Sequence, residues 1–426
     1  MFPSLVLKEI FENLEYKHKT LYACTQVNSE WFREASPILW QAPFLNKLSK
    51  THLVIKSYFQ EMSSDDKKVI EKDFNILPST PLLSYSSYLK YLDIDNFIDA
   101  VIKFCQIFYI HKESQNIIKN IIDKFLQLLV NNSTKIQHIK FVGVYPDLDN
   151  IITTLVKKQN GLKSFSIKLE IFNRHILNSL QHQARSISHL ELDSIDFHQT
   201  SFINYLIKFP LLSNLIIRDC NFDESKDNQF DSIIHQISLQ QLVIHNSNAP
   251  TLALLNICST SLKIFNIMGP HYRDSLEQVF KTIFERCHNL IDFSIIRFSC
   301  TLNYLEIPWV PNLQRLILYR NDFKINLSLM KISLNHYLRK LAQSLPKNLK
   351  KVNIWIILNP EYETELILDD LRYFFNNLNF KCSFVNIEIV HPYYRYVVSK
   401  NIRFDKTGNQ FEIDKKKYNF NEPAIM

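Results

Sequence analysis

Apolar residues recur along most of the chain in a six-position pattern whose first, fourth and sixth positions are apolar. Alternation with a period of two over its last positions predicts a short strand with one buried face. Ten copies share the pattern: Leu89/Leu92/Ile94, Ile136/Ile139/Phe141, Leu162/Phe165/Ile167, Ile187/Leu190/Leu192, Leu212/Leu215/Ile217, Leu239/Leu242/Ile244, Leu262/Phe265/Ile267, Leu290/Phe293/Ile295, Leu313/Leu316/Leu318 and Leu349/Val352/Ile354. An eleventh copy is expected at Phe384/Ile387/Ile389.

The spacing of these copies is regular. From Ile136 to Leu313, successive copies begin 23 to 28 residues apart, and helical patterns such as 199–209 and 274–286 lie between them. This resembles leucine-rich repeats, whose units are about 20 to 29 residues long. Since one unit cannot bury its own apolar edge, we expect neighbours to stack into a curved parallel sheet with helices outside, an α/β solenoid.

Three intervals are longer than the others and predict longer helices, at 96–130, 327–345 and 363–378. The chain also departs from the repeat pattern after the strands. The Asn or Cys that usually follows the strand is clear only as Cys220 and Asn321. We therefore expect irregular turns between the repeats.

The first forty residues have a different pattern and predict three short helices. Apolar residues four apart form the stripe of the first helix, at Val6, Ile10 and Leu14, with Leu7 and Phe11 beside them. The other two stripes are Leu21/Cys24/Val27 and Trp31/Phe32/Ala35, the last behind Asn28, a favoured N-cap residue. A module of this size has a core worth only a few kcal/mol, roughly, so its apolar surplus needs a neighbour.

This segment resembles the F-box. The family pattern matches, in order, at Phe2-Pro3, Ile10-Phe11, Leu14, Leu21, Val27-Asn28-Ser29-Glu30-Trp31 and Leu39-Trp40. Phe2 stands where the family prefers Leu, and Leu5 where it usually has Glu. The resemblance implies docking onto a Skp-type adaptor of a cullin-based ubiquitin ligase. The residues expected to face the adaptor or form the module core are Phe2, Pro3, Val6, Ile10, Val27 and Trp31.

A plainer interpretation of the same segment is a helical cap on the rest of the chain.

A second surface is expected on the concave side of the repeats, to which the spacer positions of each strand point. Its partner-binding candidates are Ile216, Arg218, Val243, His245, Ile317, Tyr319 and Trp355. Interfaces favour aromatic residues and Arg. The alternative is that loops or neighbouring strands cover some of these side chains.

Composition agrees with a globular protein: 46% of the 426 residues are hydrophobic and 21% are charged. Met1 runs directly into the helical module, and no apolar run reaches the roughly 18 residues of a membrane span. We therefore expect a cytoplasmic or nuclear protein without a membrane partner. The seven cysteines are scattered, without a C-x-x-C pair, and predict reduced, mostly buried thiols rather than disulfides or a zinc site.

The net charge of +7 raises the possibility of nucleic-acid binding. The excess is spread over the whole chain, however, and its one dense run, Lys415 to Lys417, is typical of a solvated tail. A basic nucleic-acid-binding solenoid would need a contiguous basic face. We do not favour it.

Enzymatic motifs are missing from the sequence. Its four glycines are not grouped, so it has no phosphate-binding glycine loop, and it contains neither G-x-S-x-G nor H-E-x-x-H. Histidines fall singly along the chain, and the adjacent Cys287 and His288 do not make a dyad, which is assembled in space. We expect no catalytic residues, no cofactor and no metal.

Together these patterns predict an F-box-like module at 1–45, a connector at 46–87, a leucine-rich-repeat solenoid at 88–391 and a C-terminal cap or tail at 392–426. By resemblance, the expected function is that of a non-catalytic substrate receptor in a Skp–cullin–F-box ubiquitin ligase. Its partners would be the adaptor, the cullin scaffold and an unidentified target protein. The competing hypothesis is a leucine-rich-repeat scaffold with no ligase role.

Overall fold

The computed structural model describes the greater part of the chain. The described residues are 4–15, 17–45, 51–71, 81–108, 115–143, 148–168, 174–197, 201–223, 237–269, 276–298, 310–321, 345–346, 349–357, 384–391, 394–397 and 416–417. The chain divides into two compact units. Unit 1 is Met1–Ile195 with Lys208–Leu211, and unit 2 is Asp196–Ile207 with Leu212–Met426.

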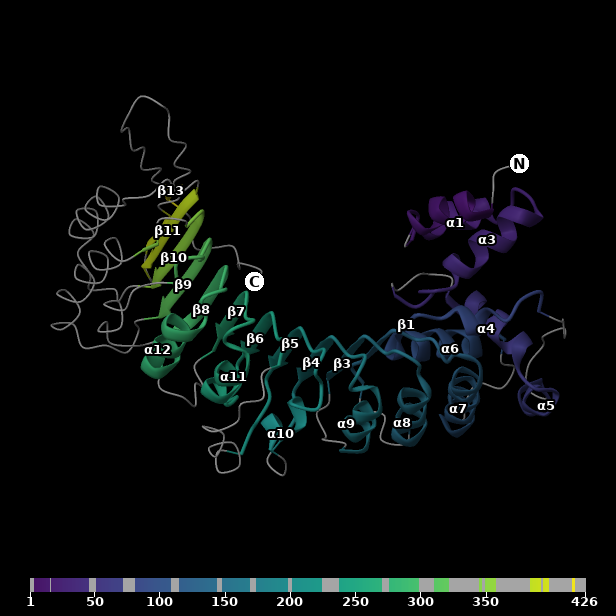
Figure 1. Cartoon of the computed structure of the whole chain (residues 1–426). Coiled ribbons are helices and arrows are strands. Elements are labelled where there is room, and N and C mark those ends of the chain that lie inside the picture. The colour runs from purple at the N-terminus through teal and green to yellow at the C-terminus, as the bar shows by residue number, and fades with distance from the viewer. Residues whose placement is uncertain are drawn as a thin grey trace. The chain divides into compact units, whose positions relative to one another are not determined.

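Unit 1 begins with the three predicted short helices, α1 (Ser4–Glu12), α2 (His18–Cys24) and α3 (Ser29–Leu39) (Figure 1). The side chain of Asn28 caps α3 by accepting a 2.9 Å hydrogen bond from the backbone N–H of Trp31. The buried core of this three-helix module is formed by Leu7, Phe11, Leu21, Cys24, Ala35 and Ile38, with Leu14, Trp31 and Leu39 packed against it.

The next helices along the chain pack against the helices that lie beside the sheet. Helix α4 (Thr51–Glu61) buries Ile55, Tyr58 and Phe59, and α6 (Ile94–Phe108) lies against it. The rings of Phe59 and Phe104 are 6.1 Å apart at their centroids. The short 3-10 helix η1 (Tyr85–Tyr88) also contacts α4. Part of the predicted connector is therefore folded onto the first helices of the sheet.

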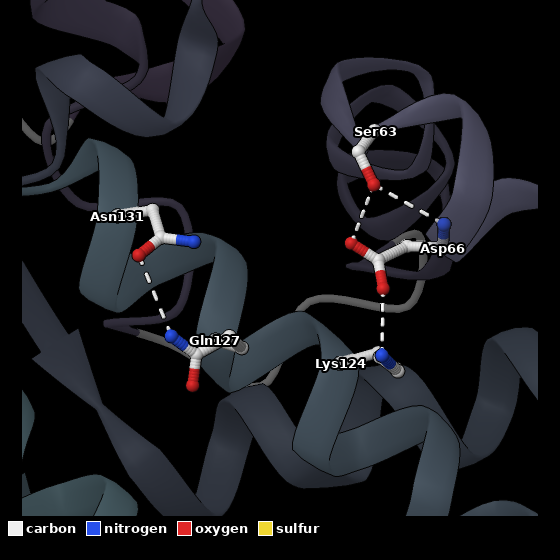
Figure 2. Close-up of polar contacts among 5 residues, drawn as sticks. All are labelled: Ser63, Asp66, Lys124, Gln127 and Asn131. Carbon is white, nitrogen blue, oxygen red and sulfur yellow. Dashed lines mark hydrogen bonds and ion pairs between the residues drawn. The ribbon is translucent and has the colours of Figure 1, made fainter.

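Polar contacts tie α5 (Ser64–Glu71) to α7 (Gln115–Asn132) (Figure 2). The Ser63 hydroxyl donates to Asp66 Oδ2 at 2.7 Å and accepts from the Asp66 backbone N–H at 3.1 Å. The other carboxylate oxygen of Asp66 pairs with Lys124 Nζ on α7 at 2.7 Å. This hydrogen bond to Lys124 is the largest cause that lowers the pKa of Asp66.

The sheet of unit 1 consists of parallel strands in sequence order: β1 (Tyr91–Asp93), β2 (His138–Phe141), β3 (Ser164–Lys168) and β4 (His189–Asp193). Figure 1 shows α7, α8 (Asp149–Lys158) and α9 (Arg174–Leu180) on one side of these strands. Along β3 and β4, buried residues alternate with half-buried ones. The predicted α/β architecture, a parallel sheet with outer helices, is confirmed.

The single helix predicted at 96–130 was wrong. The structure has two helices there, since α6 ends at Phe108 and α7 begins at Gln115. In the sequence, the polar run 111–114 separates the two apolar patterns. The helix predicted at 363–378 lies outside the described residues, as does the one at 327–345 except for Leu345.

A ladder of shared backbone carbonyls joins the strands of unit 1 at the start of each strand. The carbonyl of Lys90 accepts from the N–H groups of Gln137 and His138, at 2.8 and 2.9 Å, and the same arrangement recurs in the next strands. The first step of this ladder is Gln41, whose carbonyl accepts from Lys90 and Tyr91 at 2.9 Å. The end of the three-helix module thus occupies the place of a preceding strand.

Two buried glutamines connect successive strand–helix segments of unit 1, on the side of the sheet where the helices lie. The Gln159 side chain donates to the carbonyls of Ser133 and Leu155, at 2.9 and 2.8 Å, and accepts from the Ile136 N–H at 2.9 Å. Gln183, in the short helix η3 (Gln181–Gln183), donates in turn to the Gln159 carbonyl at 2.7 Å. These amides satisfy backbone groups that helix ends leave unpaired.

Unit 2 contains parallel strands in sequence order: β5 (Asn214–Arg218), β6 (Gln241–His245), β7 (Ile264–Met268), β8 (Asp292–Phe298), β9 (Arg315–Asn321), β10 (Lys351–Ile357) and β11 (Phe384–His391). Its described helices are α10 (Phe202–Leu206), α11 (Thr251–Cys258) and α12 (Leu276–Arg286). Two antiparallel strands end the sheet, β12 (Tyr394–Val397) and β13 (Lys416–Lys417).

The eleventh strand forms where the pattern predicts it, but its register differs by two residues. The pattern aligns Ile387 with Val352, whereas in the structure Val385 pairs with Val352, and Ile387 with Ile354. A shift of two residues keeps every side chain on the same face of the strand, so the apolar pattern alone does not distinguish the two registers.

Candidate interaction surfaces

The three-helix module leaves several large apolar side chains exposed. Helix α1 carries two neighbouring stripes, of which Leu7 and Phe11 are buried. The other side chains remain exposed: Leu5 by 81%, Val6 by 40% and Ile10 by 43%. Only part of the predicted stripe of α1 therefore lies in the core. A helix that is apolar over so wide an arc needs a second covering surface.

Two further exposed apolar residues belong to the same module. Tyr22 on α2 is 62% exposed, and Val27, in the turn before α3, is 56% exposed. We call Leu5, Val6, Ile10, Tyr22 and Val27 the apolar surface of the module. The resemblance to the F-box predicts Val6, Ile10 and Val27 as adaptor contacts and does not include Leu5 or Tyr22.

The remaining predicted adaptor residues have other positions. Trp31 is half-buried and packs its ring edge-on against Phe11, with centroids 5.3 Å apart, so it belongs to the core of the module. Phe2 and Pro3 lie outside the described residues. The N-terminus of α1 is held to α3 by the Ser4 hydroxyl, which donates to Glu34 Oε1 at 3.0 Å.

A hydrogen-bond network around Glu61 of α4 connects this helix to η1 and to the end of α7. Its carboxylate accepts from the backbone N–H of Ser86 at 3.1 Å and from the Ser86 hydroxyl. Ser86 in turn accepts from Asn132 and Ser133 at the end of α7, at 3.2 and 2.7 Å. Burial raises the pKa of Glu61, and the hydrogen bonds from Ser86 oppose that shift.

The partner-binding candidates of unit 2 lie on strand positions that alternate with the buried ones, on the sheet face opposite the helices, here called the open face. The strand register places Ile216 beside Val243 and Arg218 beside His245. Ile317 lies one strand from Asn353, and the backbones of Tyr319 and Trp355 are paired on β9 and β10. The side chains of Tyr319 and Trp355 lie outside the described part of the structure.

Exposure differs among these residues. Ile216, Arg218, His245 and Ile317 are half-buried. Val243 is only 6% exposed and is flanked in register by Ile216 and Asn266. For Val243 the alternative of a covered position is therefore confirmed, because neighbouring side chains on a sheet face cover a small residue between them. Burial is the main cause that lowers the pKa of His245; Arg218 lowers it further and Asp219 opposes the shift.

Sequence reasoning passed over two amides on this face. The Oδ1 atoms of Asn266 on β7 and Asn353 on β10 are buried and lack a hydrogen-bond partner within the part of the chain that the structure describes. Both occupy the same strand position as Val243 and Ile317. Buried amides without partners are rare. Aligning the copies of the pattern by column would have drawn attention to them.

The open face of unit 1 is polar. Lys140 pairs with Asp93 at 3.4 Å, and Lys168 pairs with Asp193 at 3.5 Å. The Ser166 hydroxyl donates to Glu191 at 3.0 Å. Charges on this face are thus largely neutralised by groups on neighbouring strands.

No family model matches the chain. An uncharacterized protein of Schizosaccharomyces pombe is 25% identical over 156 residues, which are 36% of this chain and 44% of that protein. The chain therefore matches less than half of this relative's length. In the described residues, no helix is long and apolar enough to cross a membrane.

Proposed function

We propose that the chain is the substrate-recognition subunit of an SCF-type E3 ubiquitin ligase, with an F-box-like module followed by leucine-rich repeats. The observation that carries the proposal is the apolar surface of the module. It is formed by side chains of a helical unit that already has a closed core of its own. That five large apolar side chains stay exposed within one short helical segment supports an interaction site there.

The apolar surface coincides with the F-box resemblance at Val6, Ile10 and Val27. These residues would contact a Skp-type adaptor, which links the chain to the cullin scaffold. Their burial would remove apolar area from water, worth about 25 cal/mol per Å². Leu5 and Tyr22 extend the same contact.

The repeats would supply the target-binding surface. Parallel strands that each add a few side chains to one open face form an extended surface suited to a protein partner. In this function the chain contributes proximity, holding a target near a ubiquitin-charged enzyme, and supplies no reacting group itself. The half-buried Ile216, Arg218, His245 and Ile317 remain candidate target contacts, together with Tyr319 and Trp355.

The experiment that tests the adaptor contact is affinity capture of the full chain with a Skp-type adaptor and cullin as readout. Val27→Asp and Ile10→Asp should each lower adaptor capture at least tenfold, because a charge at a contact that becomes buried costs about 2 kcal/mol or more. Thermal unfolding should change little, since both side chains are exposed.

Ile107→Asp is the matched control, because Ile107 is 55% exposed but lies on α6, outside the module. It should leave adaptor capture unchanged. Adaptor capture that survives both module substitutions in a folded protein would reject the F-box assignment. Capture of a target protein without any adaptor would favour the repeat scaffold that has no ligase role.

A further inference from the structure

One edge of unit 1 is basic. It consists of four stretches in which the chain leaves a helix and approaches the next strand, 133–138, 156–163, 180–188 and 208–211. None of these stretches contains Asp or Glu. All six of their Lys and Arg residues are exposed: Lys135, Lys157, Lys158, Lys163, Arg185 and Lys208. We call these six residues the basic edge.

Hydrogen bonds place the four stretches side by side. The Gln137 carbonyl accepts from the Lys163 N–H at 2.8 Å, and the Lys163 carbonyl accepts in turn from the Ser188 N–H at 2.9 Å. The ammonium group of Lys208 donates to Gln181 Oε1 at 3.2 Å. The six cations therefore lie along one contiguous edge, although they come from four separate parts of the sequence.

The positive charge of this edge is not neutralised within the described residues. On the open face of the same unit, Lys140 and Lys168 are paired with carboxylates. On the basic edge, Lys208 bonds to a neutral amide, and no ion pair involves any of the six cations in the part of the chain that the structure describes. The ends of α7, α8 and α9 contribute roughly half a negative charge each. That is far less than six positive charges, so the edge keeps a large positive excess.

This edge fits a nucleic acid better than a protein. Protein interfaces depend on buried aromatic and apolar anchors, but Leu211 is the one large apolar side chain exposed in the four stretches. Interfaces with nucleic acids are more polar and much more positively charged. Five of the six cations are Lys, which binds phosphate as a point charge, whereas the planar recognition of carboxylates favours Arg.

The edge also fits a duplex better than a single strand. Single strands are held by aromatic side chains on which their bases stack. The four stretches contain no Tyr or Trp, and their one Phe, Phe209, is buried. The starts of β2, β3 and β4 together span roughly 10 Å. Over that length a duplex presents about six negative charges, which is comparable to the charge of the edge.

We propose that the basic edge of unit 1 binds a nucleic-acid duplex through its phosphates, without reading its sequence. The edge is separate from the apolar surface of the module and from the partner-binding candidates on unit 2. Neither the adaptor nor a target protein is needed for this contact. The inference therefore goes beyond the proposed function, and its failure would leave that function untouched.

The first test measures binding of the full chain to a fluorescent duplex of about 20 base pairs, in a DNA form and an RNA form, over a series of salt concentrations. Saturable binding of either form supports the proposal. The slope of log K against log salt concentration should be about −3 to −5. A single strand of the same length should bind more weakly. Absence of duplex binding at about 50 mM salt, a slope near zero, or a single strand that binds as tightly would overturn the proposal.

Two further probes represent the competing polyanions. A poly-glutamate peptide stands for an acidic protein segment, and vesicles of phosphatidylcholine and phosphatidylserine stand for an anionic membrane. Each should bind at least about tenfold more weakly than the duplex at equal concentration of negative charge, because neither combines phosphates with the charge density of a duplex. Equal or tighter binding of either probe would overturn the assignment to a nucleic acid.

The second test removes charge from the edge. Substituting Lys157→Gln, Lys158→Gln and Lys163→Gln together should make the salt slope less steep by about 2 to 3, since each lost phosphate contact removes about 0.9. Binding should weaken about tenfold or more at about 100 mM salt. Arg185→Gln with Lys208→Gln repeats the test on the other stretches, and melting curves show whether each variant is folded. A folded variant with the slope of the unaltered chain would overturn the proposal.

The matched control removes the same charge elsewhere in unit 1. Lys8→Gln, Lys17→Gln and Lys19→Gln together lie at exposed positions of the three-helix module. This control should bind the duplex as tightly as the unaltered chain does. Equal weakening in the control would show that binding follows net charge alone, and would overturn the assignment to the basic edge.

Discussion

At the scale of single residues, backbone conformation explains the turns that follow the strands. Ser194, Asp219 and Asn246 have positive φ of 58°, 49° and 46°, each directly after the last residue of β4, β5 or β6. Gly269 takes the same place after β7, with φ of 128°. Small and polar residues tolerate this region better than branched ones. A residue with positive φ therefore follows each of these four strands, although the residue type differs from one turn to the next.

Gly269→Ala should destabilise the protein more than Gly161→Ala does. Both glycines have positive φ, so both substitutions strain the backbone. A Cβ at Gly269 would also meet the Cα and N of Asn246 at 2.8 and 2.9 Å, whereas nothing lies within 4 Å of a Cβ at Gly161. We expect a difference of at least about 1 kcal/mol in the free energy of unfolding. Urea denaturation of both variants measures it, and equal losses would contradict the close approach.

At the scale of elements, backbone and amide hydrogen bonds hold each strand–helix segment of unit 1 to the next one. The carbonyl ladder that begins at Gln41 pairs the end of the three-helix module with β1. The side-chain amides of Gln159 and Gln183 likewise donate hydrogen bonds to the backbone of the preceding segment, on the side of the sheet where the helices lie. The stack of Trp40 on Tyr85, with centroids 4.3 Å apart, adds an apolar contact at the same junction. The module and the first strand are thus joined through backbone as well as side chains.

Gln159→Ala should lower the free energy of unfolding by about 2 to 6 kcal/mol. It leaves the Ile136 N–H and the Ser133 carbonyl without their buried partner, and each such group costs about 1 to 3 kcal/mol. Gln127→Ala is the control, because within the described residues the Gln127 amide on α7 bonds only to Asn131, at an exposed position (Figure 2). It should change stability by less than about 0.5 kcal/mol. Equal effects in a denaturant titration would refute the structural role of Gln159.

At the scale of the whole molecule, three histidines should make stability depend on pH. Burial lowers the pKa of His18, His138 and His245 below the ordinary value of 6.5. The unfolded chain then binds protons at a higher pH than the folded chain does, so stability falls as pH decreases below about 6.5. Burial raises the pKa of the carboxyls Glu61 and Asp95, whose effect has the opposite sign and begins at more acidic pH.

Melting temperature should therefore decrease between pH 7.5 and pH 5.5. NMR titration of the histidine ring protons should give midpoints below 6.5 for these three residues. A melting temperature that stays constant, with midpoints at or above 6.5, would contradict the burial of the imidazoles. His288→Gln serves as the control, because that substitution removes none of the three and should keep the same dependence on pH.

The sequence by itself determined which residues become strands and which face of each strand is buried. Motif residues such as Leu215, Leu242 and Phe265 align in the register of the sheet because apolar alternation with period two leaves only one face to bury. The N-cap at Asn28 and the three short helices were likewise readable, since both depend on neighbours within a few residues.

Only the tertiary structure decided which apolar residues stay uncovered and which residues of distant segments meet. Val6 and Leu7 are adjacent and equally apolar, yet α3 covers only the second, because one neighbouring helix buries one side of α1. Gln41 joins the sheet, and Tyr91 and His138 stack, because strand pairing brings together residues 47 or more positions apart. Local periodicity carries no information on such pairings, which depend on the order in which complete strand–helix segments stack.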